Sequence, residues 1–275
     1  MFKKILLLGM LLFVAACGGG VNDDNVDDNN NGQLIDTANP PSIVQSIPDK
    51  DATGVLPSTS IRLIFTEDLN PETVTAANLK VTSGATVIGG NLKTAGNIVT
   101  FEPSGILPLG AVITIDASGI KDRSGQIMEA ETRSFKTASG ALIGTFALAD
   151  STFFSAGGVA QATIDKVKGV VTVNIKGNAP SDVSARWLSV AIEKDKTYVG
   201  SFVGSSTPQN SVQAELKQQG GAFASYASTT VACTGTAKFS LIPNASDLTT
   251  GRFNLNFAGA VGTYTVGTIT IFKLD

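Results

Sequence analysis

Alternation of apolar and polar side chains recurs along most of the chain after residue 40. In residues 60–66 the side chains of Ile61, Leu63 and Phe65 fall on one face of an extended segment, and residues 252–257 repeat the pattern. A period of two is typical of a β-strand with one buried side. Because helix-type periodicity is hard to find, the pattern predicts an all-β protein.

Short alternating segments fill the region from residue 40 to residue 138. Strands are expected at residues 42–47, 60–66, 79–82, 87–92, 97–101, 111–115 and 133–137. One helix-like piece is predicted at residues 71–78, where Asn70 can cap the first turn and Pro71 suits its first position. About seven or eight short strands separated by turns indicate a β-sandwich.

A second strand-rich region follows a hinge at Ser139-Gly140 and fills residues 139–275. Strands are expected at residues 142–148, 159–164, 170–175, 187–192, 198–202, 211–217, 223–228, 236–242, 251–257 and 264–273. About ten strands predict a second antiparallel β-sandwich or a flattened barrel. The hinge and a change in composition predict that the two regions fold as separate domains.

The first residues carry the pattern of an export signal. Lys3 and Lys4 precede an apolar run, and small residues precede Cys17. This run is shorter than the roughly 20 residues that a membrane-spanning helix needs. The segment Val14-Ala15-Ala16-Cys17 resembles the lipobox of bacterial lipoproteins. That resemblance implies a signal peptide at residues 1–16 and cleavage before Cys17.

Lipidation of Cys17 is a further implication of the lipobox. The expected product carries a diacylglyceryl thioether and an N-terminal acyl group such as palmitate, and more than one chain gives stable membrane anchoring. Gly18 follows the cysteine, where an Asp would favour retention in the inner membrane. We therefore expect anchoring to the outer membrane, on its periplasmic or its cell-surface face.

Residues 17–39 combine the lipidated cysteine with a flexible, acidic tether. The candidate metal ligands in this segment are Asp27, Asn29, Asn31 and Asp36. The first three, followed by Gly32, match the opening of a calcium loop. The twelfth loop position is Ala38, where a bidentate Glu is needed. A solvated spacer is therefore favoured over a calcium site, and no cofactor is predicted.

Composition narrows the functional classes. The 275 residues carry a net charge of −3 and no histidine. The absence of a basic patch argues against nucleic acid as a partner. The absence of histidine excludes Ser-His-Asp triads, Cys-His pairs and His-ligated zinc. Carboxylates of the second domain, Glu193 and Glu215 among them, are expected on the solvated surface. No enzyme is predicted, although a carboxylate pair of the glycosidase type stays open.

Two side chains of the second domain stand out by their rarity. With Cys17 lipidated, Cys233 has no disulfide partner and is predicted to be a small buried hydrophobe. Trp187, the single tryptophan, could stack on a sugar ring, because Leu188 and its neighbours fall on the opposite face of the expected strand. Tyr198, Phe202 and Tyr226 could join it. Packing in the core or on the sheet is favoured over this sugar platform.

Several motifs resemble the bacterial Ig-like domain of the S-layer SbsA type. They are Ile47–Val55, Leu63–Val74, Phe101-Glu102-Pro103, Gly119–Gln126 and Ser134–Thr137, in the family's order. The resemblance implies an Ig-like Greek-key sandwich over residues 40–138 that acts as a spacer or adhesion module. Phe65, Phe101 and Phe135 are candidate core residues, and Asp122 is favoured as a turn former over a metal ligand.

The sequence thus predicts a lipid-anchored, non-catalytic protein of the cell envelope. An Ig-like spacer would display a β-rich domain that binds an envelope or surface protein or a glycan, as in adhesion. The alternative is a carbohydrate-binding lipoprotein whose residues 139–275 take a glycan. An aromatic row in a groove would favour the alternative.

Overall fold

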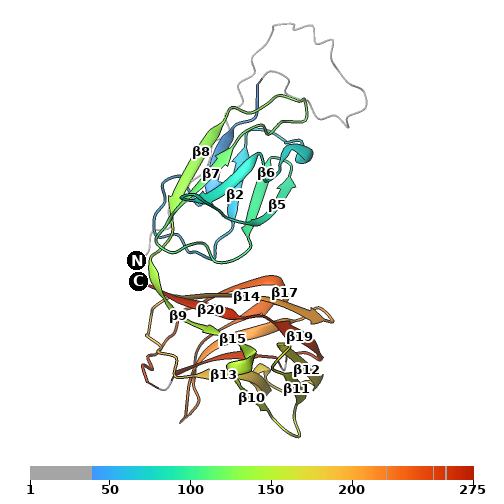
Figure 1. Cartoon of the computed structure of the whole chain (residues 1–275), viewed down its shortest axis with the longest axis vertical. Coiled ribbons are helices and arrows are strands. Elements are labelled where there is room, and N and C mark those ends of the chain that lie inside the picture. The colour runs from blue at the N-terminus through green and yellow to red at the C-terminus, as the bar shows by residue number, and fades with distance from the viewer. Residues whose placement is uncertain (1–38, 221, 250, 258) are drawn as a thin grey trace, which may run out of the picture. The chain divides into compact units, whose positions relative to one another are not determined.

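The computed structural model describes residues 39–220, 222–249, 251–257 and 259–275, chiefly as strands and the turns between them (Figure 1). Buried apolar side chains form two clusters, one drawn from residues 43–135 and one from residues 148–271. The fold is all-β, as predicted. In the described part of the chain, no helix has the length and apolar character needed to cross a membrane.

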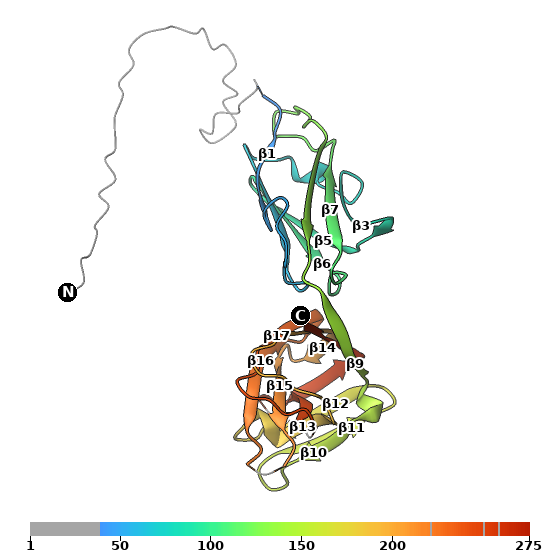
Figure 2. The ribbon, with the colours of Figure 1, turned by 90° about the vertical axis from the view of Figure 1, so that its left-hand side faces the viewer.

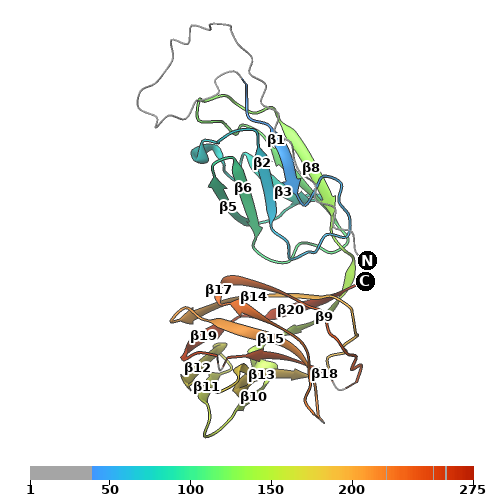
Figure 3. The same cartoon turned by 180° about the vertical axis from the view of Figure 1, so that it is seen from behind.

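The first sandwich consists of two antiparallel sheets of four strands each. One sheet has the order β1 (Ile43–Ile47), β2 (Ile61–Phe65), β6 (Ile98–Pro103) and β5 (Gly90–Ala95), which Figure 3 shows side by side. The other has the order β4 (Thr86–Val87), β3 (Leu79–Ser83), β7 (Val112–Ala117) and β8 (Glu131–Lys136). The strands expected from the alternation are present, and the segment expected at residues 87–92 is divided between β4 and β5.

The core of the first sandwich contains the predicted aromatic residues. Phe65, Phe101 and Phe135 are all buried in one cluster, as expected. Asp122 is also buried, and its carboxylate accepts hydrogen bonds from the Gln126 backbone N–H at 2.8 Å and the Ser124 hydroxyl at 2.7 Å. These bonds close a turn, so the turn-forming role is confirmed.

The helix-like piece of the first sandwich is shorter than expected. It is a single 3₁₀ turn, η1 (Pro71–Thr73), where the sequence predicted a helix to residue 78. The predicted cap is present, because the Asn70 side chain accepts a hydrogen bond from the Glu72 backbone N–H at 3.1 Å.

The second sandwich pairs a five-stranded sheet with a seven-stranded sheet (Figures 1 and 2). The five-stranded sheet has the order β10 (Thr152–Ser155), β13 (Val183–Leu188), β18 (Gly251–Asn256), β15 (Ser211–Gln218) and β16 (Ser225–Ala232). The seven-stranded sheet has the order β11 (Gln161–Asp165), β12 (Val170–Ile175), β19 (Gly262–Val266), β14 (Tyr198–Thr207), β20 (Ile269–Leu274) and β9 (Gly140–Phe146), and β17 (Thr234–Leu241) also pairs with β14. Two short 3₁₀ turns are η2 (Leu148–Asp150) and η3 (Pro180–Asp182).

Aromatic rings join the two sheets of the second sandwich. Phe253 of β18 stacks on Phe239 of β17, with ring centroids 5.8 Å apart, and lies 5.7 Å from the Phe146 ring of β9. This cross-sheet packing makes the domain a sandwich, one of the two architectures that the sequence left open. Cys233 is buried in the same cluster, as its prediction as a small hydrophobe requires.

In the second sandwich one strand was not predicted, and two predicted strands have different bounds in the structure. Strand β10 was missed because it is only four residues long. The segment expected at residues 264–273 is two strands, β19 and β20. The segment expected at residues 187–192 is instead β13, which ends at Leu188 because Ser189 adopts a left-handed backbone with φ of 61°.

Candidate functional site: the polar face of the five-stranded sheet

The residues singled out from the sequence have different outcomes. Cys17 and the candidate calcium ligands Asp27, Asn29, Asn31 and Asp36 lie outside the described residues. Tyr198 and Phe202 are buried in the core of the second sandwich, and Tyr226 is partly buried against it. The structure therefore gives none of these aromatic side chains the open surface that a sugar platform needs.

Trp187 is a core residue, as the sequence analysis favoured, and the alternative of a sugar platform is excluded. Its side chain is 5% exposed and stacks on Phe253, with ring centroids 5.5 Å apart. The indole N–H donates to the Ala147 carbonyl at 2.9 Å. The argument for an exposed Trp187 assumed a strand over residues 187–192, but β13 ends at Leu188, so the apolar residues beyond Ser189 do not continue its alternation.

A different surface of the same domain gathers functional side chains. On β13, β18 and β15 every second residue points away from the aromatic core, and strand register aligns these residues across the sheet. We define the polar face as the side chains of Ser184, Arg186, Gln213, Glu215, Lys217, Ser228, Thr230, Arg252, Asn254 and Asn256. Asn254 lies between Arg186 and Glu215 in the register, and Asn256 lies between Ser184 and Gln213. Figure 2 labels β10, β13, β15 and β16 of this sheet, and Figure 3 labels β18.

The centre of the polar face is buried although its residues are polar or charged. Asn254 is 0% exposed, Asn256 1%, Glu215 4% and Arg252 5%. Arg186, Gln213 and Lys217 are half-buried, and Ser228 and Thr230 are exposed at the β16 side. The sequence prediction that Glu215 lies on the solvated surface was therefore wrong. Buried polar groups need partners, so their hydrogen bonds decide what the face can bind.

Glu215 organises the hydrogen bonds at the centre of the face. Its Oε2 accepts from Asn254 Nδ2 at 3.2 Å and from Asn256 Nδ2 at 3.0 Å. Its Oε1 accepts from Lys217 Nζ at 3.4 Å. Asn256 Nδ2 also donates to Gln213 Oε1 at 3.0 Å. The carboxylate is therefore fully engaged by donors of its own domain.

Two buried amide oxygens on the face have no hydrogen-bond partner. They are Asn254 Oδ1 and Asn256 Oδ1. Since both Nδ2 atoms point to Glu215, the planar amides turn their oxygens away from that carboxylate. A buried acceptor without a donor costs about 1–3 kcal/mol. Each of the two oxygens therefore needs a donor that the described side chains do not supply.

Two arginines lie over phenylalanine rings at the margins of the face. The Arg186 guanidinium carbon is 3.8 Å from the centroid of Phe154, and that of Arg252 is 5.3 Å from the centroid of Phe223. Both rings are accessible, with Phe154 38% and Phe223 50% exposed. Arg186 Nε donates to Ser184 Oγ at 2.9 Å, and Arg252 Nη1 donates to Gln219 Oε1 at 3.3 Å.

The described side chains of the face are mostly hydrogen-bond donors and acceptors. They include one carboxylate, whereas glycoside hydrolysis generally uses two. Within the described ranges no group of three His, Cys, Asp or Glu side chains is placed to hold a metal ion. Amides, hydroxyls and guanidinium groups instead offer a dense set of donors and acceptors.

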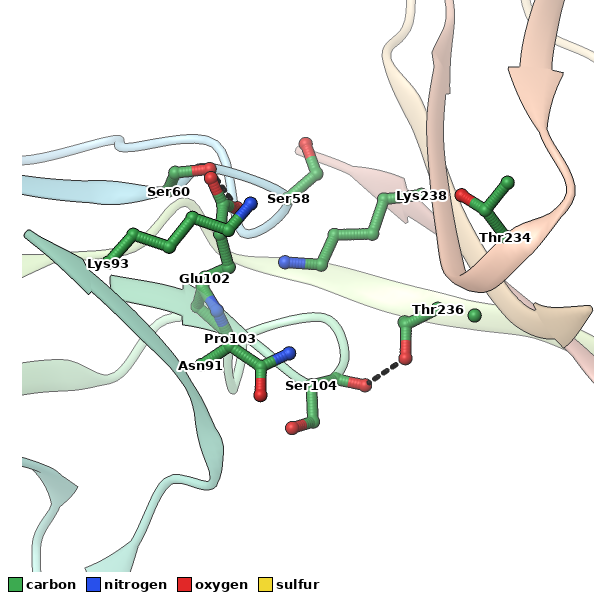
Figure 4. Close-up of a pocket in the computed structure, with 11 residues that line it drawn as sticks. Ser58, Ser60, Asn91, Lys93, Glu102, Pro103, Ser104, Thr234, Thr236 and Lys238 are labelled. Atoms are coloured by element: carbon green, nitrogen blue, oxygen red, sulfur yellow. Dashed lines mark hydrogen bonds between the residues drawn. The ribbon is translucent and has the colours of Figure 1, made fainter. Parts of the chain in front are cut away.

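A second polar region lies in the first sandwich. The Ser60 hydroxyl donates to Glu102 Oε2, and Lys93 lies beside this pair (Figure 4). The Glu102 carboxylate already accepts a hydrogen bond from Ser60 of the same sandwich, so it does not require a ligand as a donor. The polar face of the five-stranded sheet remains the stronger candidate.

One comparison with known proteins identifies the domain type of the first sandwich. Residues 37–137 match the family model of the bacterial Ig-like domain. The Ig-like resemblance of this region is therefore confirmed. Among curated proteins, no relative matches the chain.

Solved structures with distant similarity include modules from glycan-binding and surface-layer proteins. The second N-terminal cellulose-binding domain of β-1,4-glucanase C from Cellulomonas fimi has 16% identity and a TM-score of 0.35, over 50% of this chain and 92% of that chain. The xylan-binding domain CBM22-1 from Paenibacillus barcinonensis has 12% identity and a TM-score of 0.32, over 50% and 98%. The N-terminal part of the bacterial S-layer protein SbsC has 18% identity and a TM-score of 0.31, over 74% and 44%. At these values we infer ligand chemistry only from this chain's own side chains.

Proposed function

We propose that this chain is a lipid-anchored, non-catalytic protein of the cell envelope whose second sandwich binds a glycan through the polar face. The observation that carries the proposal is the pair of buried, unmatched oxygens of Asn254 and Asn256 within a cluster of amides and hydroxyls. Sugar hydroxyls both donate and accept, so they can satisfy these oxygens and bond to the neighbouring Gln213 side chain.

The margins of the face suit a sugar ring as well. Phe154 and Phe223 are 38% and 50% exposed, and the apolar face of a pyranose would pack on the side of each ring that its arginine does not cover. Ligand sites typically combine aromatic walls with a few placed polar groups. In this proposal the aromatic contact with the sugar comes from these two phenylalanines and not from Trp187, the weaker candidate of the sequence analysis.

The first sandwich and the N-terminal segment bear on where the protein is located in the cell. The match to the bacterial Ig-like domain supports a spacer role for the first sandwich, of the SbsA type that its motifs resemble. The lipobox at Val14–Cys17 supports lipidation at Cys17 and residence in the outer membrane. In this proposal the spacer holds the glycan-binding sandwich away from the membrane, where it serves adhesion or envelope binding.

A substitution in the centre of the face tests the function. Asn254→Leu keeps a similar side-chain volume and removes both the unmatched oxygen and the amide donor. We expect full-length protein in mild detergent to bind glycans on an array, and Asn254→Leu to weaken the strongest hit by about tenfold or more. Its thermal stability should stay within a few degrees of the parent, because the loss of an unmatched acceptor offsets the loss of the bond to Glu215, which keeps Asn256 and Lys217 as donors.

The matched control is Asn174→Leu, which removes an exposed amide from β12 of the other sheet. It should bind like the parent protein. The proposed function fails if no glycan on the array is bound, or if Asn254→Leu binds as tightly as Asn174→Leu.

A further inference from the structure

We infer that the glycan held by the polar face is acidic, with its anionic group, a carboxylate or a sulfate, seated between Arg186 and Arg252. This inference rests on the glycan-binding function proposed above and adds the class of ligand. Its basis is the arrangement of charge on the face, which the neutral chemistry of amides and hydroxyls does not explain.

The two arginines are diagonal neighbours on one face of the sheet. Arg186 lies opposite Asn254 in the register, and Arg252 is two residues before Asn254 on the same strand. Side chains in this diagonal relation have Cα atoms about 7–8 Å apart, within the reach of two long side chains. Both guanidinium groups would reach an anion above Asn254 if they turned inward from their present partners, Ser184 and Gln219.

The face carries an excess of positive charge. Its charged side chains are Arg186 on β13, Arg252 on β18, and Lys217 and Glu215 on β15, whereas the face residues of β10 and β16 are uncharged. Three cations thus face one carboxylate, although the chain as a whole has a net charge of −3. The pairing of β13, β18 and β15 brings Arg186, Arg252 and Lys217 together on one face of the sheet.

Glu215, the one carboxylate of the face, forms an ion pair with neither arginine. Glu215 pairs with Lys217 at 3.4 Å and accepts from both asparagines. Among the described residues, neither Arg186 nor Arg252 has a carboxylate within ion-pair distance. Their described partners are the neutral oxygens of Ser184 and Gln219 and the two phenyl rings.

The electrostatics agree with a missing anion. Burial, and after it the positive charge of Arg252, lowers the pKa of Arg186 to about 10, so the guanidinium is still charged at neutral pH. Burial also lowers the pKa of Arg252, and the negative charge of Glu215 acts in the opposite direction on both arginines. Two half-desolvated cations that repel each other are relieved by a shared anion. The planar fork of each guanidinium fits two oxygens of a carboxylate or a sulfate.

Paired probes test this inference. We would measure binding of full-length protein in mild detergent to oligogalacturonate, oligoalginate and oligoglucuronate, each beside its methyl ester, and to sulfated oligosaccharides beside their desulfated forms. At least one acidic probe should bind about tenfold or more tightly than its uncharged partner, and 0.5 M salt should weaken that binding. The uronate and sulfate arms show which anionic group is used.

Variants connect the charge preference to the two arginines. Arg186→Gln and Arg252→Gln should each reduce binding of the acidic probe by about tenfold to a hundredfold while changing binding of its uncharged partner little. Arg186→Lys keeps the charge but loses the fork, so it should lose less. The control Arg62→Gln removes an exposed arginine of β2 and should bind like the parent. If Trp187 fluorescence shows that a Gln variant is unfolded, Arg186→Lys decides.

The outcomes separate the inference from the proposed function. Equal binding of acidic and uncharged probes, or binding that is indifferent to Arg186 and Arg252, overturns the acidic ligand and leaves the glycan-binding function standing. A protein that binds no glycan of either kind overturns both.

Discussion

Phe253→Ala is expected to destabilise the second sandwich strongly. The side chain is fully buried and lies between Trp187, Phe239 and Phe146, with centroid distances of 5.5, 5.8 and 5.7 Å. Truncating a buried Phe typically costs about 3–5 kcal/mol, and each lost aromatic pair adds about 0.5–1.5 kcal/mol. Because these contributions overlap and the site relaxes, we expect a loss of about 4–5 kcal/mol. Domains of this size are stable by about 5–15 kcal/mol, so the variant should fold only marginally.

The chain contains its own probe for this measurement. Trp187 is the only tryptophan and stacks on Phe253, so its fluorescence follows unfolding of the second sandwich in the full-length protein. With a urea dependence of about 2 kcal/mol per M, the midpoint should fall by about 2 M. The control Leu248→Ala, at a largely exposed side chain, should change stability by less than about 0.5 kcal/mol. A loss below about 1 kcal/mol in Phe253→Ala would refute the packing of the three rings around it.

Three further results are expected. Cys17→Ala should take no label from a radioactive fatty acid, and a labelled variant would contradict lipidation. Cys233 should resist alkylation at pH 8 in the native protein and react in urea, because burial raises the pKa of its thiol; rapid native labelling would place the thiol at the surface. Millimolar calcium should leave the melts of both sandwiches unchanged by calorimetry, and an upward shift of several degrees would make Asp27, Asn29, Asn31 and Asp36 a real site.

Much of the fold could be predicted because each β-strand has a local signature. β12 is present with the bounds expected from its apolar run, and the alternation around β18 correctly assigned Phe253 and Leu255 to the core. The motifs of the first sandwich were informative for the same reason, since they are turn and core residues in fixed order. Failures occurred where a single backbone angle ended a strand, as at Ser189.

The candidate site could not be predicted to the same extent. Alternation correctly placed Asn254 and Asn256 on the side away from the core, but it gave no sign that this side is buried. Their burial depends on Arg186 and Glu215, which come from strands far away in the sequence and meet them only through the register of the sheet. The exposure of a polar side chain on a strand depends on which residues are its cross-strand neighbours. Those neighbours cannot be read from the sequence.

The two sides of β18 contribute differently to the stability of the second sandwich. On the inner side, Phe253 and Leu255 bury their full apolar surface, a stabilising contribution of roughly 1.5–3 kcal/mol each. On the outer side, two amide oxygens lack partners and a desolvated Arg252 faces Arg186, which destabilises the free protein. A face selected only for stability would be apolar or fully matched, since removing a half-satisfied polar group can be neutral or stabilising. In the proposed function, a ligand that donates to these oxygens and brings negative charge to the arginines offsets both of these costs.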